Sequence, residues 1–409
     1  FKIIQPCRRH QRPWSVQLDE RAEYQPFPWL CEGLTSISLA ATVEDASELW
    51  EWDVDPIRRG LLGALPFMPT VLSEWLLSYA FDPGPESRAH AGSSGRAVGL
   101  SDVQRLRDAY EAFSEMDHRY GGGLVRPAVV GFLNDQVKPL LNGTYTDEVG
   151  SQLMTAASTL THLAAWEAYD MNMHGLAQAH YGQSLRLAKA ADDRLTASWT
   201  LKWMAQQAID LKRPDEAVRL ARAAQKTIGR TTPRVRAFLL LREARATALG
   251  VELAETPNRH DIRRVHRLLR ETEEAFAKAE DGHEEPPWAA FDYDYAELSA
   301  EAGYVWLMIG EHQRARANAE IALEHFDAAS YARSRQLNLI HRGEALLGEG
   351  ELDEAITSVR QAVPVVATLS SARLVTRVRN FDQSLTRYAK EPAVKEWRDY
   401  LRSVSFATT

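Results

Sequence analysis

One pattern of small residues returns at a fixed interval in the second half of the chain, and it constrains the fold more than any other sequence feature. Each copy starts with Ala, continues four positions later and ends with a small residue three positions after that. The interval from position 177 to 217, and from 315 to 355, is 40 residues. Because positions i, i+4 and i+7 share one helical face, these residues let each helix approach a neighbour closely. The copies are Ala177, Tyr181, Ser184; Ala217, Ala221, Ala224; Ala315, Ala319, Ala322; and Ala355, Val359, Ala362.

A turn signal and another helical stretch precede each copy, so the repeating unit is a pair of helices. Pro214 lies where a second helix would begin, a position that tolerates proline. The longer interval between Ala217 and Ala315 predicts one enlarged, irregular pair with helices near residues 234–250 and 259–280. Equal spacing is typical of a stack of repeats, so we expect an α-solenoid of about five to six helix pairs over residues 146–409. A helical bundle with Ala-rich contacts is the alternative.

The N-terminal part also carries helical patterns. Apolar stripes predict helices over residues 50–65, 68–81 and 124–141, and Ser101 with Gln104 predicts a capping box at the start of another helix. Residues 82–100 are rich in Gly, Pro and Ser, so we expect a flexible loop within a helical domain that spans residues 46–145. No alternating apolar pattern is flanked by hairpin turns. We therefore predict an all-α fold with essentially no sheet.

Composition and charge narrow the class of protein. Apolar residues make up 45% of the chain and charged residues 25%, as in ordinary folded proteins. No apolar run approaches the roughly 20 residues that span a bilayer, and two cysteines are too few for a disulfide framework. We expect a cytoplasmic protein without membrane contact. Since the formal net charge is -8, DNA contact would require a local basic patch. The candidate patch comprises Lys2, Arg8, Arg9, His10 and Arg12.

A search for catalytic and metal-binding motifs favours a protein that is not an enzyme. The glycines at 121–123 lack the Lys and Ser/Thr of a phosphate-binding loop, so a helix-ending turn is the preferred interpretation. The chain contains no HExxH or GxSxG motif, no kinase signature and no dinucleotide fingerprint. His174 and His180 flank a predicted helix start, and structural roles are preferred over metal ligation. We expect no catalytic residues, no metal and no cofactor.

Two segments, "RPDEAVRLARAA" and "GELDEAITSVRQAV", resemble the second helix of tetratricopeptide (TPR) units. In TPR-like stacks the first helix of each pair lines the concave side, so the resemblance implies a ligand-binding groove on those helices. Packing between repeats is the alternative for its aromatic residues. The predicted groove residues are His162, Trp166, Tyr169, Asp170, Lys202, Gln206, Tyr304, Asn338 and His341, with Trp199, Trp203 and Glu344 as further candidates.

Longer segments resemble a known family. "SDVQRLRDAYEAFSEMDHRYGGG", "VKPLLNGTYTDEVGSQL" and "LAAWEAYDMNMHGLAQAHYGQSLRLAKAADDRL" are similar to actinobacterial helix-turn-helix (XRE-type) transcriptional regulators with a C-terminal TPR array, and the likeness covers roughly residues 45–405. The family resemblance implies an N-terminal DNA-binding domain. Pro26 and Pro28 interrupt residues 24–34, so residues 1–45 are interpreted as a remnant or divergent helix-turn-helix region.

The resemblance implies a transcriptional regulator of development or secondary metabolism whose array senses a ligand. That ligand is a peptide, a small molecule or a protein. DNA is the second expected partner, through Arg8, Arg9 and Arg12, and a homodimer is a further expectation. The alternative function is a protein–protein interaction scaffold that does not bind DNA. The two differ in the need for a recognition helix with base-reading side chains.

Overall fold

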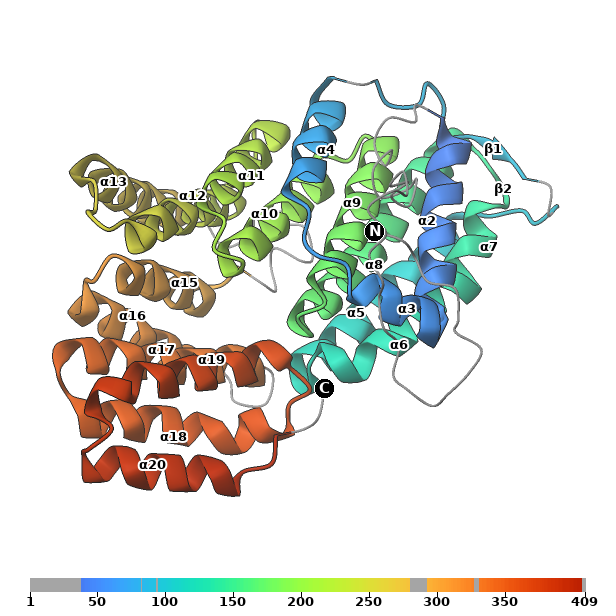
Figure 1. Ribbon diagram of the computed structural model, residues 1–409. Coiled ribbons are helices and arrows are strands. Elements are labelled where there is room, and N and C mark those ends of the chain that lie inside the picture. The colour runs from blue at the N-terminus through green and yellow to red at the C-terminus, as the bar shows by residue number, and fades with distance from the viewer. Residues whose placement is uncertain (1–37, 82, 93–94, 280–292, 327–330, 407–409) are drawn as a thin grey trace, which may run out of the picture.

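The computed structural model describes residues 38–81, 83–92, 95–279, 293–326 and 331–406, and these are almost entirely helical (Figure 1). The N-terminal part precedes a long array of helices. Its elements are α2 (Leu39–Val54), α3 (Pro56–Gly63), α4 (Pro69–Phe81), β1 (His90–Ala91), α5 (Leu100–Tyr120), α6 (Gly122–Phe132), the π-helical turn η1 (Leu133–Val137), α7 (Lys138–Leu141) and β2 (Thr144–Tyr145). The predicted all-α class is confirmed for these residues.

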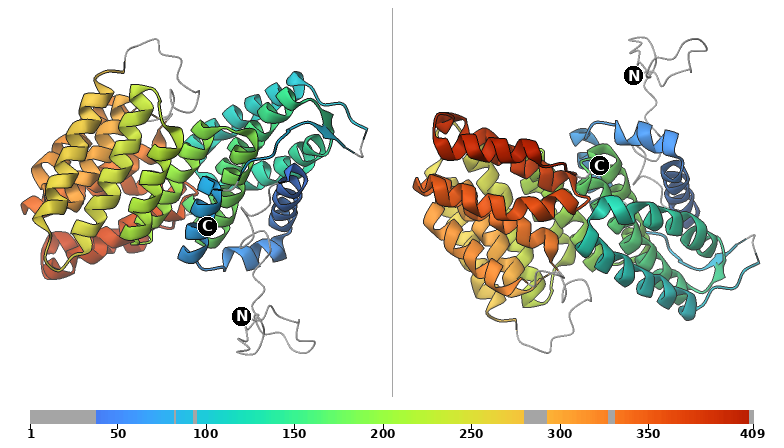
Figure 2. Two further views of the ribbon diagram at one scale, coloured as in Figure 1. Left: turned by 90° about the horizontal axis from the view of Figure 1, so that it is seen from above. Right: turned by 90° about the horizontal axis from the view of Figure 1, so that it is seen from below.

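The array consists of consecutive helices that pack side by side (Figure 2). Its first and second helices alternate as α8 (Asp147–Asp170), α9 (His174–Ala191), α10 (Arg194–Asp210), α11 (Pro214–Ile228), α12 (Pro233–Leu253), α13 (Arg259–Phe276), α15 (Tyr295–Met308), α16 (His312–His325), α17 (Ala332–Glu349) and α18 (Leu352–Thr368). It ends with α19 (Ala372–Ser384), the 3-10 turn η2 (Leu385–Tyr388) and α20 (Pro392–Ser403). This consecutive packing is compatible with a solenoid, and the enlarged pair predicted between Ala217 and Ala315 is present as α12 and α13.

The recurring small residues lie where the two helices of a pair meet. All twelve are buried, and they lie on the second helices α9, α11, α16 and α18. A side-chain bond recurs with them: Ser158 Oγ donates to the Ser184 carbonyl at 2.7 Å, and Ser198 Oγ donates to the Ala224 carbonyl at 2.8 Å. Equivalent faces of successive pairs therefore meet in the same way, as the 40-residue interval predicts.

Four of the five turns inside the pairs from α8 to α18 contain a residue with positive φ, and the turn between α12 and α13 does not. Asn172 and Lys212 adopt positive φ angles of 60° and 57°, and Gly310 and Gly350 adopt 79° and 93°. A left-handed residue ends a helix by redirecting the chain within one turn. Pro214 occupies the first position of α11 as predicted. The first helices α8, α10, α15 and α17 therefore end in the same way.

Two local predictions for the N-terminal part are wrong. The capping box of Ser101 and Gln104 is absent because α5 starts earlier: the Gly99 N–H donates to Asp102 Oδ2 at 2.9 Å and Ser101 lies within the first turn. The predicted helix over residues 50–65 is two helices, because the Asp55 carboxylate caps α3 and Pro56 takes its first position. At the start of α5 and of α3, the hydrogen bonds that cap the helix determine where it begins, and the apolar periodicity does not.

The predicted loop between α4 and α5 makes fixed contacts where it is described. Its residues His90 and Ala91 form strand β1, which pairs with β2 in an antiparallel sheet of two residues per strand. The Arg88 N–H donates to Asp147 Oδ1 at 2.6 Å, and its Nε donates to the Ala190 carbonyl. The loop therefore lies along the start of the array.

The last helices of the array return to the helices that precede it (Figure 2, right). The Ser370 N–H donates to the Tyr120 carbonyl, and the Gly123 N–H donates to the Ser370 carbonyl, both at 3.1 Å. Gly121 ends α5 with φ 85°, and an added Cβ would lie 2.7 Å from the Ser370 oxygen. The glycine-rich segment is thus a helix-ending turn, as expected, and its lack of side chains lets it contact the segment that follows α18. We refer to this junction as the closing contact.

Candidate functional site

The first helices of the array surround a cavity on the inside of the closed ring. Side chains from α5, α8, α10, α12, α15, α17 and α19 line it, and its empty space, together with the open solvent at its mouth, amounts to about 1140 Å³. We name it the inner cavity. A second cavity of about 1300 Å³, again including open space, is lined by the C-terminal ends of the same first helices and by α19.

The two cavities lie at different levels along the same helices. On α10, Gln206 lines the inner cavity and Asp210, one turn later, lines the second cavity. Three residues, Tyr304, Arg373 and Arg377, line both. These side chains therefore form the wall between the cavities, and α19 contributes two of the three.

Most of the predicted groove residues line the inner cavity. The seven that do so are His162, Trp166, Lys202, Gln206, Tyr304, Asn338 and His341, and the further candidates Trp199 and Trp203 join them. Tyr304 also lines the second cavity, as does Glu344. Tyr169 and Asp170, in contrast, line neither cavity, and 1% and 0% of their surface is exposed. Their roles are to hold the ring together.

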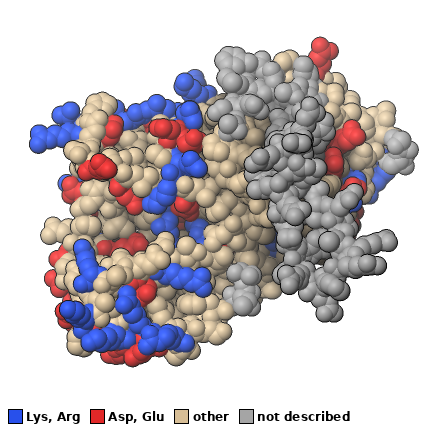
Figure 3. Space-filling view, viewed as in Figure 1, with Lys and Arg blue, Asp and Glu red and all other residues tan. Residues whose placement is uncertain are grey.

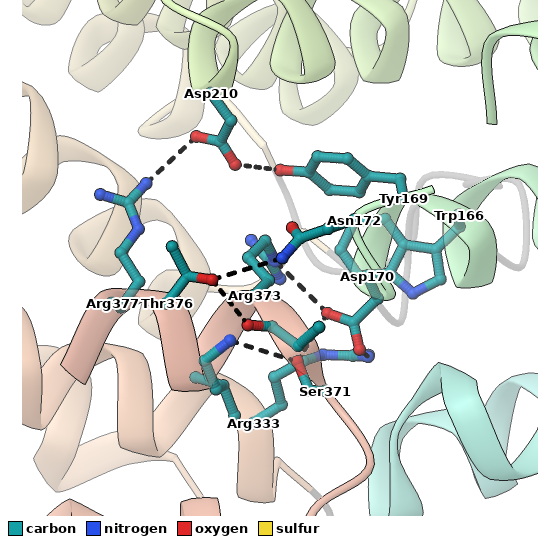
Figure 4. Close-up of polar contacts among 12 residues, drawn as sticks. Trp166, Tyr169, Asp170, Asn172, Asp210, Arg333, Ser371, Arg373, Thr376 and Arg377 are labelled. Carbon is teal, nitrogen blue, oxygen red and sulfur yellow. Dashed lines mark hydrogen bonds and ion pairs between the residues drawn. The ribbon is translucent and has the colours of Figure 1, made fainter. Parts of the chain in front are cut away.

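Asp170 joins the C-terminal helices to α8 (Figure 4). Its Oδ2 accepts from Arg333 Nη1 at 3.2 Å, and its Oδ1 accepts from Ser371 Oγ at 2.9 Å and from Arg373 Nε at 3.3 Å. Arg333 also donates from Nη2 to Asp117 Oδ2 on α5 at 2.6 Å. One buried guanidinium therefore ties α17 to both α5 and α8, next to the closing contact.

Asp210 organises the wall between the cavities (Figure 4). It accepts from Tyr169 Oη and from Arg377 Nη2, the latter at 3.1 Å, while Arg377 Nη1 donates to Tyr304 Oη at 2.6 Å. Burial opposes ionisation of Asp210, but Arg377, Arg245 and Arg373 outweigh it and hold its pKa below the usual range. The phenol of Tyr169 is thus committed to a structural bond, which explains why it does not face the cavity.

Cations lie on aromatic rings around the inner cavity. Lys202 Nζ is 4.2 Å from the Trp203 ring centre, and Arg245 Cζ is 4.3 Å from that of Tyr304. Arg333 Cζ is 4.9 Å from the Trp166 ring centre. Such contacts strengthen when water is excluded. The cavity wall therefore combines flat apolar surface with positive charge.

Glu301 supports the cationic side of the cavity from α15. It accepts from Arg242 Nη2 at 2.6 Å and lies 3.5 Å from Arg245 Nη1. Burial favours its neutral form, yet Arg242, Arg245 and Lys202 lower its pKa to about 2. Glu301 therefore stays ionised and fixes both arginines in position.

Two polar side chains at the cavity wall have unused bonding capacity. His341 stacks on Tyr304 with ring centres 4.3 Å apart, and neither of its ring nitrogens has a hydrogen-bond partner among the described residues. Asn338 Oδ1, one turn earlier, also has none within that part of the chain. Burial, with Arg377, Arg245 and Arg373, lowers the pKa of His341 well below its usual value. A neutral imidazole offers one donor and one acceptor.

Sequence reasoning missed the arginines that give the cavity its charge. Arg245, Arg333, Arg373 and Arg377 occupy helical positions where long cationic side chains normally face water, so composition alone does not single them out. Two of them lie on α19, beyond the regular pairs. The available signal was the spacing of Arg373 and Arg377, which places both on one face of a helix.

The remaining predicted sites receive no structural description. Arg8, Arg9 and Arg12, the predicted DNA-binding residues, lie outside the described residues, as does most of the predicted helix-turn-helix region. Within the described part of the chain, His, Cys, Asp and Glu nowhere form a group of three that could hold a metal ion. None of the described helices is both long and apolar enough to cross a bilayer. No protein-family model matches the chain, and no curated protein sequence matches it significantly.

Proposed function

We propose that this chain is a regulatory protein, not an enzyme, whose TPR-like array binds a ligand in the inner cavity. The observation that carries the proposal is the inner cavity, lined by aromatic, cationic and unpartnered polar side chains on the first helices. Concave sites with a few directed polar groups are typical of ligand binding. Regulation of transcription in development or secondary metabolism is the part of the proposal that rests on the family resemblance.

The closing contact supports a small ligand over a folded protein partner. Arg333 joins α17 to Asp117 on α5, and Ser370 joins the turn at residues 120–123. A ring that is closed in this way has no open groove for a whole domain. The proposed ligand is therefore a small molecule or a short peptide, and the scaffold alternative loses the open concave surface that it needs.

Contacts connect the cavity to the N-terminal helices. The α5 helix supplies cavity residues and packs on α6, whose Arg126 pairs with the buried Asp53 of α2. His180 Nε2 lies 2.6 Å from the same carboxylate. Burial opposes its ionisation, but Arg126 and His180 lower the pKa of Asp53 to about 2. Because α2 follows the segment to which the resemblance assigns DNA reading, we propose that ligand binding biases that segment through α5, α6 and α2.

The proposal is tested by thermal denaturation of the full chain against a defined set of small metabolites and tripeptides. A ligand present at about 100 times its Kd stabilises a protein by about 2.7 kcal/mol and raises the Tm by several degrees. Ser334 lines the cavity, so Ser334→Trp should remove the Tm rise, whereas Ala112→Trp on the exposed face of α5 should retain it. Stabilisation that persists in Ser334→Trp would place the ligand outside the inner cavity.

The regulatory part needs a separate measurement. Selection of duplexes from a random DNA pool by the full chain, with and without a stabilising compound, should recover sites whose retention the compound changes. A chain that binds its compound in the cavity but recovers no DNA would be a sensor that acts through a protein partner. That outcome would overturn the transcriptional assignment and leave the cavity assignment in place.

A further inference from the structure

We propose that the inner cavity recognises an organic anion, namely a carboxylate, sulfonate or phosphate group carried on a flat, largely apolar body. The inference rests on the proposed function, because it names the chemical class of that function's ligand. It is built on the balance of buried charge, on guanidinium donors that face the cavity and on the aromatic surfaces beneath them.

Buried cations outnumber the carboxylates that pair with them. Around the cavity, within the described residues, five arginine side chains are at most 15% exposed, against four comparably buried carboxylates in ion pairs with them. Glu167, a fifth buried carboxyl group, does not offset the excess because burial and the nearby Asp117 raise its pKa well above the usual value. The arginines are Arg242, Arg245, Arg333, Arg373 and Arg377, and the carboxylates are Asp117, Asp170, Asp210 and Glu301.

Two acidic residues at the edges narrow this excess. Glu297 lies half-buried at the inner cavity, and Glu344 lines the second cavity with its pKa raised to about 7 by burial. On the face seen in Figure 3, Lys and Arg are interspersed with Asp and Glu. Buried guanidinium groups at the inner wall that lack a carboxylate partner are favourable only where an anion can compensate them.

Two guanidiniums that line the cavity have N–H groups without a hydrogen-bond partner among the described residues. Arg373 uses its Nε for Asp170, and neither of its Nη atoms has a hydrogen-bond partner among the described residues. Arg245 makes a single 3.5 Å ion pair with Glu301 through Nη1. Both side chains line the inner cavity. Paired N–H groups of this kind match the oxygens of a carboxylate, sulfonate or phosphate.

The aromatic wall supplies the surface for an apolar body. The ring centres of Trp166 and Trp203 are 4.5 Å apart, and the His341 ring stacks on the ring of Tyr304. The neutral His341, 9% exposed and without a partner among the described residues, can donate to the ligand or accept from it. A flat ligand would therefore lie against the indoles while its acidic group reaches Arg373 and Arg245.

Two fluorescent probes with the same rings separate charge from apolar burial. The anionic probe is 8-anilinonaphthalene-1-sulfonate, and N-phenyl-1-naphthylamine is its counterpart without the sulfonate. In titrations of the full chain we expect saturable fluorescence with the anionic probe. Replacing the two arginines together, Arg245→Gln with Arg373→Gln, should weaken its binding at least tenfold and that of the neutral probe less than twofold.

The chain offers a matched control for this double variant. Arg360 also lies over a tyrosine, Tyr400, and pairs with a carboxylate, Glu396, but on the exposed surface. Arg360→Gln should leave both affinities unchanged. Because the cavity arginines also stabilise the ring of helices, Arg373→Lys provides a second variant, which keeps the positive charge but lacks the paired N–H groups of the guanidinium. It should give an intermediate affinity with a Tm near that of the parent.

The outcomes distinguish this inference from the proposed function. If Ser334→Trp blocks both probes while the double arginine variant leaves the anionic probe unchanged, the cavity binds ligands but does not select anions, and this inference alone is overturned. If Ser334→Trp affects neither probe, the cavity is not a binding site and the proposed function fails as well. No saturable binding of the anionic probe would overturn the inference directly.

Discussion

Arg333→Gln tests whether the closing contact contributes to the stability of the whole ring. The parent side chain is 6% exposed and lies between Asp117 and Asp170, which are 1% and 0% exposed. Removal of one partner of a buried pair costs about 3 to 5 kcal/mol. We expect the lower end, about 3 kcal/mol, because Trp166 Nε1 still donates to Asp117 and Ser371 Oγ still donates to Asp170.

The pH dependence of this loss follows from Asp117. Burial opposes ionisation of this carboxyl group, but Arg333 outweighs it and holds the pKa below the usual value. In the parent, the resulting stability is present above the unfolded pKa of about 3.9 and is lost as the pH falls. In Arg333→Gln burial dominates and the pKa rises, so stability falls as the pH rises above about 3.9. The difference between parent and variant should be largest near pH 7 and shrink towards pH 4.

Hydrogen–deuterium exchange locates the effect. Amides of α5 and α17 should exchange faster in Arg333→Gln, whereas those in α10 and α11 should change little, because these helices lie away from the junction. Arg360→Gln, which removes an exposed pair, is the control and should leave the exchange of α5 and α17 unchanged. A denaturation midpoint for Arg333→Gln equal to that of the control would refute the view that the closure stabilises the ring.

Three further predictions concern other parts of the structure. Ala217→Phe should lower stability by about 1 to 3 kcal/mol, because Ala217 is fully buried between α10 and α11, whereas the exposed Ala112→Phe should leave the melting curve unchanged. Gly121→Ala should cost about 1 to 3 kcal/mol, as it strains a conformation that favours glycine, whereas Gly131→Ala near the C-terminal end of α6 should be neutral or stabilising in urea unfolding. Glu167→Gln should match the stability of the parent near pH 4 and exceed it as the pH rises above about 4.3. The reason is that the raised pKa of Glu167 makes the parent lose stability as the pH rises above that value. Parallel pH profiles of stability for variant and parent would contradict this.

The regular part of the fold could be predicted because its signal is local and repeated. The interval between Ala177 and Ala217 indicates that the same face of each second helix packs on its neighbour, and Pro214 marks a helix start within two residues. The boundary of α5 could not be predicted as well, because Asp102 and Ser101 both offer plausible capping chemistry. Only the observed bond from the Gly99 N–H to Asp102 decides between them.

The candidate site could be predicted only in part, for a geometric reason. The resemblance to TPR units assigns the first helix of each pair to the concave side, and that was enough to place Lys202 and Gln206 at the cavity. It does not report how deep a side chain lies, so Tyr169 was placed at the cavity although it bonds to Asp210 behind it. Arg333 could not be found in this way, because its partner Asp117 is 216 residues distant in sequence.

The long-range pairing of Arg333 with Asp117 has a consequence for how the chain folds. In an open repeat array each pair needs only its neighbours, so folding can begin anywhere and spread. Here the contact between α5 and α17 can form only after the intervening helices are in place, and the entropy of joining such distant segments opposes its early formation. We expect the junction to form last in refolding. A destabilised pair anywhere between α8 and α16 would then weaken the bond between Arg333 and Asp117 without contacting it, so the strength of this bond reports whether all the helices between α5 and α17 are folded.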